Sequence, residues 1–188
     1  MNNSHVFPLT EVKPHNGAPA LFLNGAPLFP LFLMTGPAPL AQLIALEPTG
    51  VHLQTDVFPF GWVGIGTFDY SAFDEMVAAY LAADTEALLM PRLHLDPPED
   101  WMAAHPDELV GYADPQAWDG ETCWGGPRHP SFASKPWRAD TSDALRRLIQ
   151  HVAQSGYADR IIGWHIGSGV YGEWHAWNGV YYPDTSAP

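Results

Sequence analysis

The sequence predicts an α/β protein, a TIM (β/α)8-barrel truncated to about its first four β/α units with an N-terminal β-hairpin. Strand-like apolar runs alternate with helix-like stretches along the chain, which indicates a parallel sheet with helical crossovers. The segments that follow the expected strands hold most of the tryptophans, and barrel ligand sites lie in those segments. The chain has 188 residues where a full barrel needs about 250, so we expect roughly half of the barrel to be missing.

A doubly wound sheet is the competing α/β architecture. Such a sheet usually carries a glycine-rich, phosphate-binding turn after its first strand. Here the first long apolar run ends in Met34-Thr35-Gly36-Pro37, which lacks the G-x-G-x-x-G spacing of that turn. The sequence therefore favours the barrel.

The chain is expected to divide into an extended N-terminal lead-in, residues 1–18, and the barrel domain, residues 19–188. Asn24-Gly25 lies between two apolar runs. This dipeptide favours a type I′ turn, because both turn positions need a positive φ. We expect a short strand at 20–23 and a longer one at about 28–34. The longer run is uniformly apolar, which is typical of a strand covered on both faces.

The remaining elements follow from capping and periodicity. Ser71 is expected to begin a helix, whose buried face has the helical spacing of Phe73, Met76, Val77, Tyr80 and Leu81. Asp140 or Thr141 is expected to cap a second long helix. The expected order is completed by a short helix around 39–46, strands at 51–57, 86–94 and 160–166, and a long irregular stretch at 95–138.

Charge and composition argue against several classes of function. The formal net charge is −13 with only 8 Lys and Arg residues. These cations are mostly scattered, so the sequence lacks the basic cluster of a nucleic-acid-binding surface. No apolar run reaches the roughly 20 residues of a membrane helix. The first residues do not resemble a signal peptide, and the single cysteine, Cys123, allows no internal disulfide, so we expect a cytoplasmic protein.

Four segments carry a family resemblance. They are Leu23 to Leu28 (LNGAPL), Thr67 to Asp74 (TFDYSAFD), Pro91 to Trp101 with His105 to Glu108, and Ile162 to His165 with Gly172 to Trp174. In this order, across about residues 20–180, they resemble the barrel domain of retaining glycoside hydrolases of the β-galactosidase type. The resemblance implies that the full-length protein hydrolyses O-glycosidic bonds and that Glu173 is the general acid/base.

This chemistry needs a second carboxyl group besides Glu173. In a retaining glycosidase one carboxylate attacks the sugar and the other group protonates the leaving oxygen, at a separation of about 5–5.5 Å. The aromatic neighbours Tyr171 and Trp174 are expected to raise the pKa of Glu173 by burial. The family carries its nucleophile on strand seven, so this chain alone is expected to be inactive. Family members usually have Asn-Glu directly after strand four, whereas here a glycine-rich loop intervenes and Gly172 replaces the Asn.

Aromatic and polar side chains near the strand ends are candidates for sugar binding. Pyranose CH faces pack on aromatic rings, so we expect stacking on Trp62, Trp101, Trp124, Trp174 and Trp177. The candidates for contacts with substrate hydroxyls are Asp56, Arg92, His94 and His165. The alternatives are core packing for the tryptophans and a structural ion pair of Arg92 with Asp56 or Asp96.

The sequence predicts a carbohydrate as the partner and no metal or other cofactor. The nine histidines show no HExxH or HxH spacing, which a metal site would favour. A barrel relative that binds carbohydrate without cleaving it is the alternative function. The inner face of a half-barrel would be exposed, so self-association is also expected.

Overall fold

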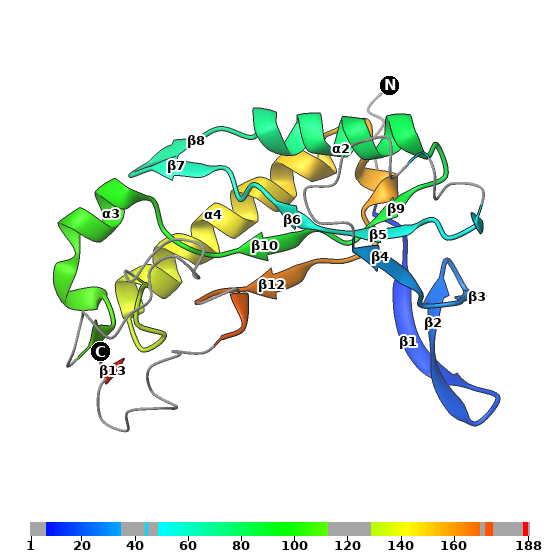
Figure 1. Ribbon diagram of the computed structural model, residues 1–188, viewed down its shortest axis with the longest axis horizontal. Coiled ribbons are helices and arrows are strands. Elements are labelled where there is room, and N and C mark those ends of the chain that lie inside the picture. The colour runs from blue at the N-terminus through cyan, green and yellow to red at the C-terminus, as the bar shows by residue number, and fades with distance from the viewer. Residues whose placement is uncertain are drawn as a thin grey trace. The chain divides into compact units, whose positions relative to one another are not determined.

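The computed structural model describes residues 7–34, 44, 49–112, 129–169, 172–174 and 186–187 (Figure 1). The chain forms two compact units. The first comprises Met1–Phe58, Ser71–Arg92 and Ile149–His165, and the second Pro59–Tyr70, Leu93–Leu148 and Ile166–Pro188.

The predicted truncated TIM barrel is wrong. The described residues contain only three α-helices, α2 (Ser71–Ala83), α3 (Glu99–Ala104) and α4 (Lys135–Ala153). Their strands form several small sheets, some antiparallel and some parallel, whereas four β/α units of a barrel require one continuous parallel sheet with a helix after each strand. The apolar runs that the sequence offers as long strands are interrupted, two of them at prolines, which cannot donate to a sheet ladder.

An antiparallel sheet lies at the N-terminal end of the first unit, in the order β1 (Thr10–His15), β2 (Ala18–Leu23), β3 (Ala26–Leu28). Leu23 pairs with Ala26, and φ is 49° at Asn24 and 84° at Gly25, so the predicted two-residue turn with two positive φ angles is confirmed. The lead-in also contributes a paired strand, because β1 joins β2 through a second turn of this kind, Asn16-Gly17, with φ of 50° and 83°.

A parallel sheet of the first unit joins β4 (Phe32–Met34), β5 (Leu53–Thr55) and β9 (Leu88–Leu89). Phe32 pairs with Leu53, and Leu53 with Leu88. The predicted strand at 28–34 is divided into β3 and β4 around Pro30. Its residues are not covered on both faces as predicted, because Phe29 is 79% and Met34 59% exposed.

The core of the first unit is built on α2, which begins at Ser71 as predicted. Phe73, Val77 and Tyr80 are buried along its inner face. Phe58, at the end of β6 (Val57–Phe58), packs on this face, with ring centroids 5.3 Å from Phe73 and 5.7 Å from Tyr80. The helical spacing of these apolar residues therefore fixes the orientation of α2 within the unit.

Asp74 anchors the first turn of α2 by side-chain hydrogen bonds. Its carboxylate lies 2.8 Å from His151 Nε2 and accepts a short hydrogen bond from the Tyr157 hydroxyl. Burial of Tyr157, and its hydrogen bond to this carboxylate, raise the pKa of the phenol above its ordinary value. All three residues belong to the first unit, so they join segments that are distant in sequence.

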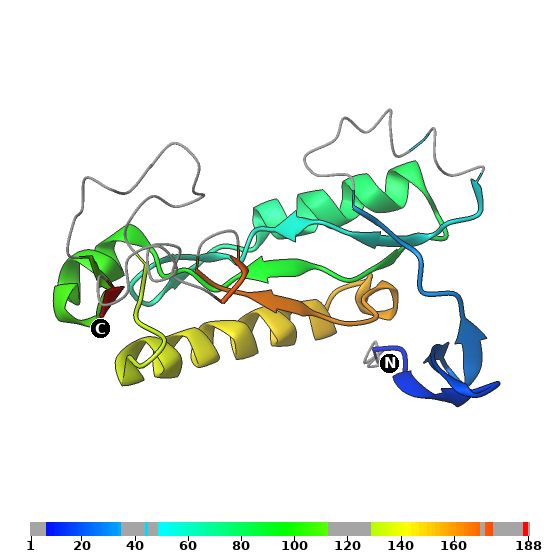
Figure 2. The ribbon, with the colours of Figure 1, turned by 60° about the horizontal axis from the view of Figure 1, so that its bottom comes forward.

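Helix α4, the long yellow helix in Figure 2, begins at Lys135, before the caps predicted at Asp140 or Thr141. The cap is Ser134, whose Oγ accepts a hydrogen bond from the Trp137 N–H at 3.1 Å. Such a bond satisfies an amide that has no partner within the helix. Trp137 is 3% exposed, and its indole N–H donates to the Leu95 carbonyl oxygen at 3.1 Å. The earlier start therefore places this tryptophan in the core of the second unit.

The second unit contains an antiparallel hairpin of β7 (Trp62–Gly64) and β8 (Thr67–Phe68). The stretch predicted to be irregular contains α3, the 3-10 helix Pro106–Glu108 and β11 (Gly111–Tyr112), which pairs with β13 (Ser186–Ala187). The predicted strands at 86–94 and 160–166 become β9, β10 (Arg92–His94), the 3-10 helix Ala158–Arg160 and β12 (His165–Gly167). β12, β10 and β6 form a three-stranded sheet in the order β12-β10-β6.

The short helix predicted around 39–46 lies outside the described residues except for Ile44. Across the described ranges, no helix is both long enough and apolar enough to cross a membrane.

Candidate functional site

The glycine-rich segment after β12 folds back on itself in the second unit. The Gly172 N–H donates to the Gly169 carbonyl oxygen at 2.9 Å, and the Trp174 N–H to the Ser168 carbonyl oxygen at 2.8 Å. A Cβ at Gly167 would lie 2.7 Å from the Gly172 carbonyl oxygen, so only glycine permits this close approach. The loop is thus held by its own backbone and returns Glu173 and Trp174 to the end of β12.

Trp174 is a fixed and exposed aromatic side chain. Its indole N–H donates to the Ile166 carbonyl oxygen at 2.9 Å, the residue is 48% exposed, and its φ is 56°. A left-handed backbone at a residue other than glycine costs about 1–2 kcal/mol, and such strain gathers at functional sites. Phe132, itself 36% exposed, packs against the indole with centroids 5.4 Å apart at 53°. The two rings form an exposed platform, which we call the Trp174 platform.

Glu173 lies beside this platform with an exposed side chain. Its carboxylate makes no hydrogen bond or ion pair with another described residue, and it is free to meet a ligand. The burial expected from its aromatic neighbours is not seen for the described part of the loop, and Tyr171 lies outside the described residues.

Polar groups outside the predicted set of site residues lie in or beside this loop. The Leu95 N–H donates to the Gly167 carbonyl oxygen at 2.8 Å, which brings the neighbouring Asp96 to the loop. His129, 3% exposed, has its Nδ1 3.6 Å from Asp96 Oδ1. The Ser168 hydroxyl is buried, with no hydrogen-bond partner among the described residues. The available signal was the polar run around His129 inside the long connection, but it had no spacing that marks a site.

Asp56, Arg92 and His165 lie together in the first unit. Asp56 is 3% exposed, and its carboxylate accepts hydrogen bonds from the Tyr80 hydroxyl at 2.8 Å and the Val57 N–H at 2.7 Å. The Arg92 N–H donates to the Asp56 carbonyl oxygen at 2.8 Å. These contacts are those of a buried structural carboxylate.

His165 stands at the start of β12 and is largely exposed. Its partial burial and, second, the charge of Arg92 lower the pKa of the imidazole below its ordinary value. The ring is therefore held more strongly in its neutral form, in which it both donates and accepts hydrogen bonds. This is compatible with contact to a polar ligand.

The other predicted tryptophans differ from Trp174. Trp62 and Trp101 are 8% and 1% exposed and meet edge to face, with centroids 6.3 Å apart. Trp101 therefore packs in the core of the second unit and offers no open face to a sugar. His94 is half-buried on β10, whereas the predicted stacking residues Trp124 and Trp177 lie outside the described residues.

The structure thus brings Glu173 and Trp174 together in the second unit and places Asp56, Arg92 and His165 in the first. Within the described ranges, no three His, Cys, Asp or Glu side chains converge as the ligands of a metal ion. No protein-family model matches the chain, and no curated protein matches it.

Proposed function

We propose that the protein acts on carbohydrate, as part of a β-galactosidase-like glycoside hydrolase in which Glu173 is the general acid/base. The observation that supports this most is the pairing of an exposed carboxylate with an exposed, fixed indole at Trp174. A pyranose that stacks its CH face on an aromatic ring leaves its hydroxyls and glycosidic oxygen at the edge of the ring. Glu173 is the adjacent residue that can meet that edge.

In glycoside hydrolysis Glu173 would act first as the general acid and then as the general base. As a carboxylic acid it donates its proton to the leaving glycosidic oxygen, and as a carboxylate it then removes a proton from water. The reaction also needs a second carboxylate as the nucleophile.

Sugar binding is tested first, on the 188-residue chain. Tryptophan fluorescence is titrated with galactose, lactose, glucose and xylose for the wild type and for Trp174→Ala. Loss of the stacking surface is expected to weaken binding by about tenfold or more, which corresponds to roughly 1.4 kcal/mol. Phe29→Ala is the matched control, because Phe29 is an aromatic residue exposed to 79% in the first unit. Equal affinities for wild type and Trp174→Ala would refute the platform.

Hydrolysis is tested on the full protein that the gene encodes, with aryl β-galactosides and related aryl glycosides. Glu173→Gln keeps the size of the side chain and removes its acid function, so turnover should fall by about 10²–10⁴, the usual contribution of a general acid/base. Near-normal turnover by this variant would end the assignment.

A second candidate function is carbohydrate binding without cleavage. The exposed position of Glu173 favours it, because a catalytic general acid normally lies in a partly closed pocket. In that case Glu173→Gln would leave sugar affinity unchanged and no form of the protein would release the aryl group.

A further inference from the structure

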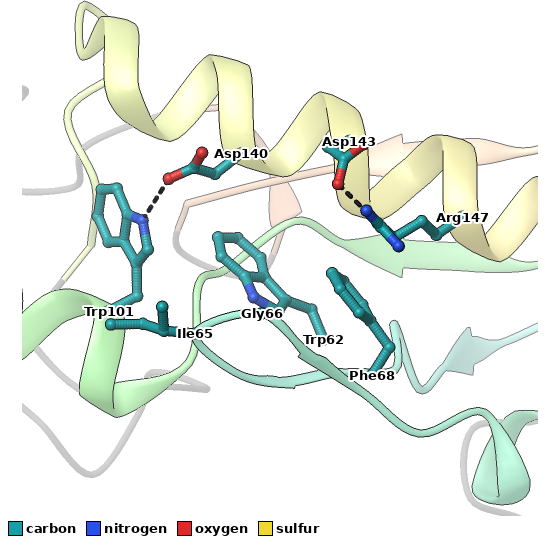
Figure 3. Close-up of a pocket in the computed structure, with 8 residues that line it drawn as sticks. All are labelled: Trp62, Ile65, Gly66, Phe68, Trp101, Asp140, Asp143 and Arg147. Atoms are coloured by element: carbon teal, nitrogen blue, oxygen red, sulfur yellow. Dashed lines mark hydrogen bonds and ion pairs between the residues drawn. The ribbon is translucent and has the colours of Figure 1, made fainter.

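A second concave site lies in the second unit, outside the glycine-rich loop. It is a pocket of about 210 Å³ between the β7–β8 hairpin, α3 and α4, and Figure 3 shows the side chains that surround it. None of its lining residues belongs to the segment that carries Glu173 and Trp174. Pockets for drug-sized ligands occupy about 300–1,000 Å³, so this one suits a single small ring.

One wall of the pocket is aromatic and preformed. Trp62 and Phe68 come from the hairpin, and Trp101 from α3 packs edge to face against Trp62. The turn of the hairpin is tied to α3, because the Ile65 N–H donates to Asp100 Oδ2 at 2.8 Å. Trp101 is only 1% exposed, so it supports Trp62 from behind, and Trp62 and Phe68 are the rings that a ligand would contact.

The opposite wall is polar and comes from one face of α4. Asp140, Asp143 and Arg147 are three or four residues apart, and Figure 3 shows them projecting toward the aromatic rings. Asp140 Oδ2 accepts a hydrogen bond from the Trp101 indole N–H at 2.8 Å. Arg147 is held by its Nε, 2.6 Å from Asp143 Oδ2, and its guanidinium carbon lies 4.9 Å from the Phe68 ring centroid.

These contacts leave complementary groups for a ligand. Asp140 Oδ1 and the Nη groups of Arg147 bond no other described residue, so the pocket offers one acceptor and one set of donors. A cationic ligand would meet Arg147, and an anionic ligand would meet Asp140. A neutral ring with neighbouring hydroxyls suits both, since a hydroxyl donates to the carboxylate and accepts from the guanidinium.

We infer that this pocket is a separate binding site for a neutral monosaccharide unit, with Asp140 and Arg147 holding its hydroxyls against Trp62 and Phe68. This pocket and the Trp174 platform are both proposed to bind sugar, which rests on the proposed function. They share no residue, so each can be tested and refuted without the other. Asp140 and Arg147 act as binding residues here and have no part in bond cleavage.

The test follows indole N–H signals by ¹H–¹⁵N NMR while galactose or glucose is added to the 188-residue chain. Arg147→Met removes the donors and keeps an apolar stem on Phe68. Arg147 has a side chain 53% exposed, so the variant is expected to fold, which its melting temperature checks. Arg146→Met is the matched control, because this neighbouring arginine is exposed and does not line the pocket.

We expect the Trp62 signal to shift on sugar addition in the wild type, in Arg146→Met and in Trp174→Ala. Arg147→Met should weaken this response by about tenfold, the loss of roughly one charge-assisted hydrogen bond. The inference is overturned if Trp62 does not respond to either sugar, if Arg147→Met binds as the wild type does, or if Trp174→Ala abolishes the Trp62 response. If sugar shifts the Trp62 signal and not the Trp174 signal, the loop site is refuted and the pocket is supported.

Discussion

The hydrogen bond between Tyr80 and Asp56 offers the sharpest test of how the first unit is stabilised. Tyr80 is 4% and Asp56 3% exposed, and the hydroxyl donates to Asp56 Oδ2 at 2.8 Å. Tyr80→Phe removes this donor and keeps the ring stacked on Phe58. A hydrogen bond to a charged group contributes about 1.5–3 kcal/mol, so we expect the free energy of unfolding to fall by about 2 kcal/mol.

Urea denaturation followed by circular dichroism at pH 7 measures this change in the free energy of unfolding. For a chain of this size a loss of about 2 kcal/mol corresponds to a melting temperature lower by roughly 4–8 °C. A double-mutant cycle with Asp56→Asn isolates the pairwise energy, because both partners are in direct contact. A change below about 0.5 kcal/mol would contradict this reasoning. A loss of sugar binding in Asp56→Asn with unchanged stability would favour the ligand role that the sequence suggested.

Two further predictions concern pH and backbone conformation. Burial and the Asp74 hydrogen bond raise the pKa of Tyr157; the unfolded chain therefore releases this proton near pH 10 while the folded chain retains it, and stability is lost as the pH rises above about 10. Tyr157→Phe should flatten that loss in urea denaturation between about pH 9 and 11, and an unchanged slope would contradict the reasoning. Gly61 has φ of 78°, and a Cβ there would lie 2.4 Å from Tyr70 Cδ1. Gly61→Ala should lower stability by about 2–4 kcal/mol, whereas the control Gly66→Ala, with φ of 69° and open space around it, should lose only about 1 kcal/mol, as melting temperatures will show.

Local signals in the sequence predicted local structure well. Asn24-Gly25 and Ser71 act through neighbouring backbone atoms, and the turn and the helix start both lie where they were expected. Asn16-Gly17 carries the same turn signal, but the surrounding residues were interpreted as an unpaired lead-in. The cap at Ser134 differs from the predicted Asp140 or Thr141, because α4 begins with Lys135 and Pro136 and proline is well tolerated in a first helical turn.

The sheet arrangement required information that periodicity does not contain. A run of apolar residues gives the propensity for a strand, but not the partner of that strand. The runs that contain Pro30 and Pro91 were extended across residues where the strands stop. The resulting barrel was too regular, and the antiparallel hairpin β7–β8 was not foreseen.

The candidate site was predicted only in its exposed part. Trp174 and Trp101 are both tryptophans in connections rich in glycine or proline, and composition cannot distinguish them. Trp101 is buried because it lies on the inner face of the short helix α3, and Trp174 is exposed because its own N–H groups fold the loop back. Burial of an aromatic ring depends on these tertiary contacts.

The two compact units are interleaved along the sequence, and this affects when each unit can fold during synthesis. Each unit is assembled from three segments, and the first unit is complete only with His165. At about 5–20 residues per second a ribosome needs roughly 10–30 s to reach that residue. β5 and β6 must therefore wait for their later partners β9 and β10, and the first unit waits for its last segment, Ile149–His165. We expect the newborn chain to depend on chaperones during synthesis, and a slower ribosome to increase its aggregation.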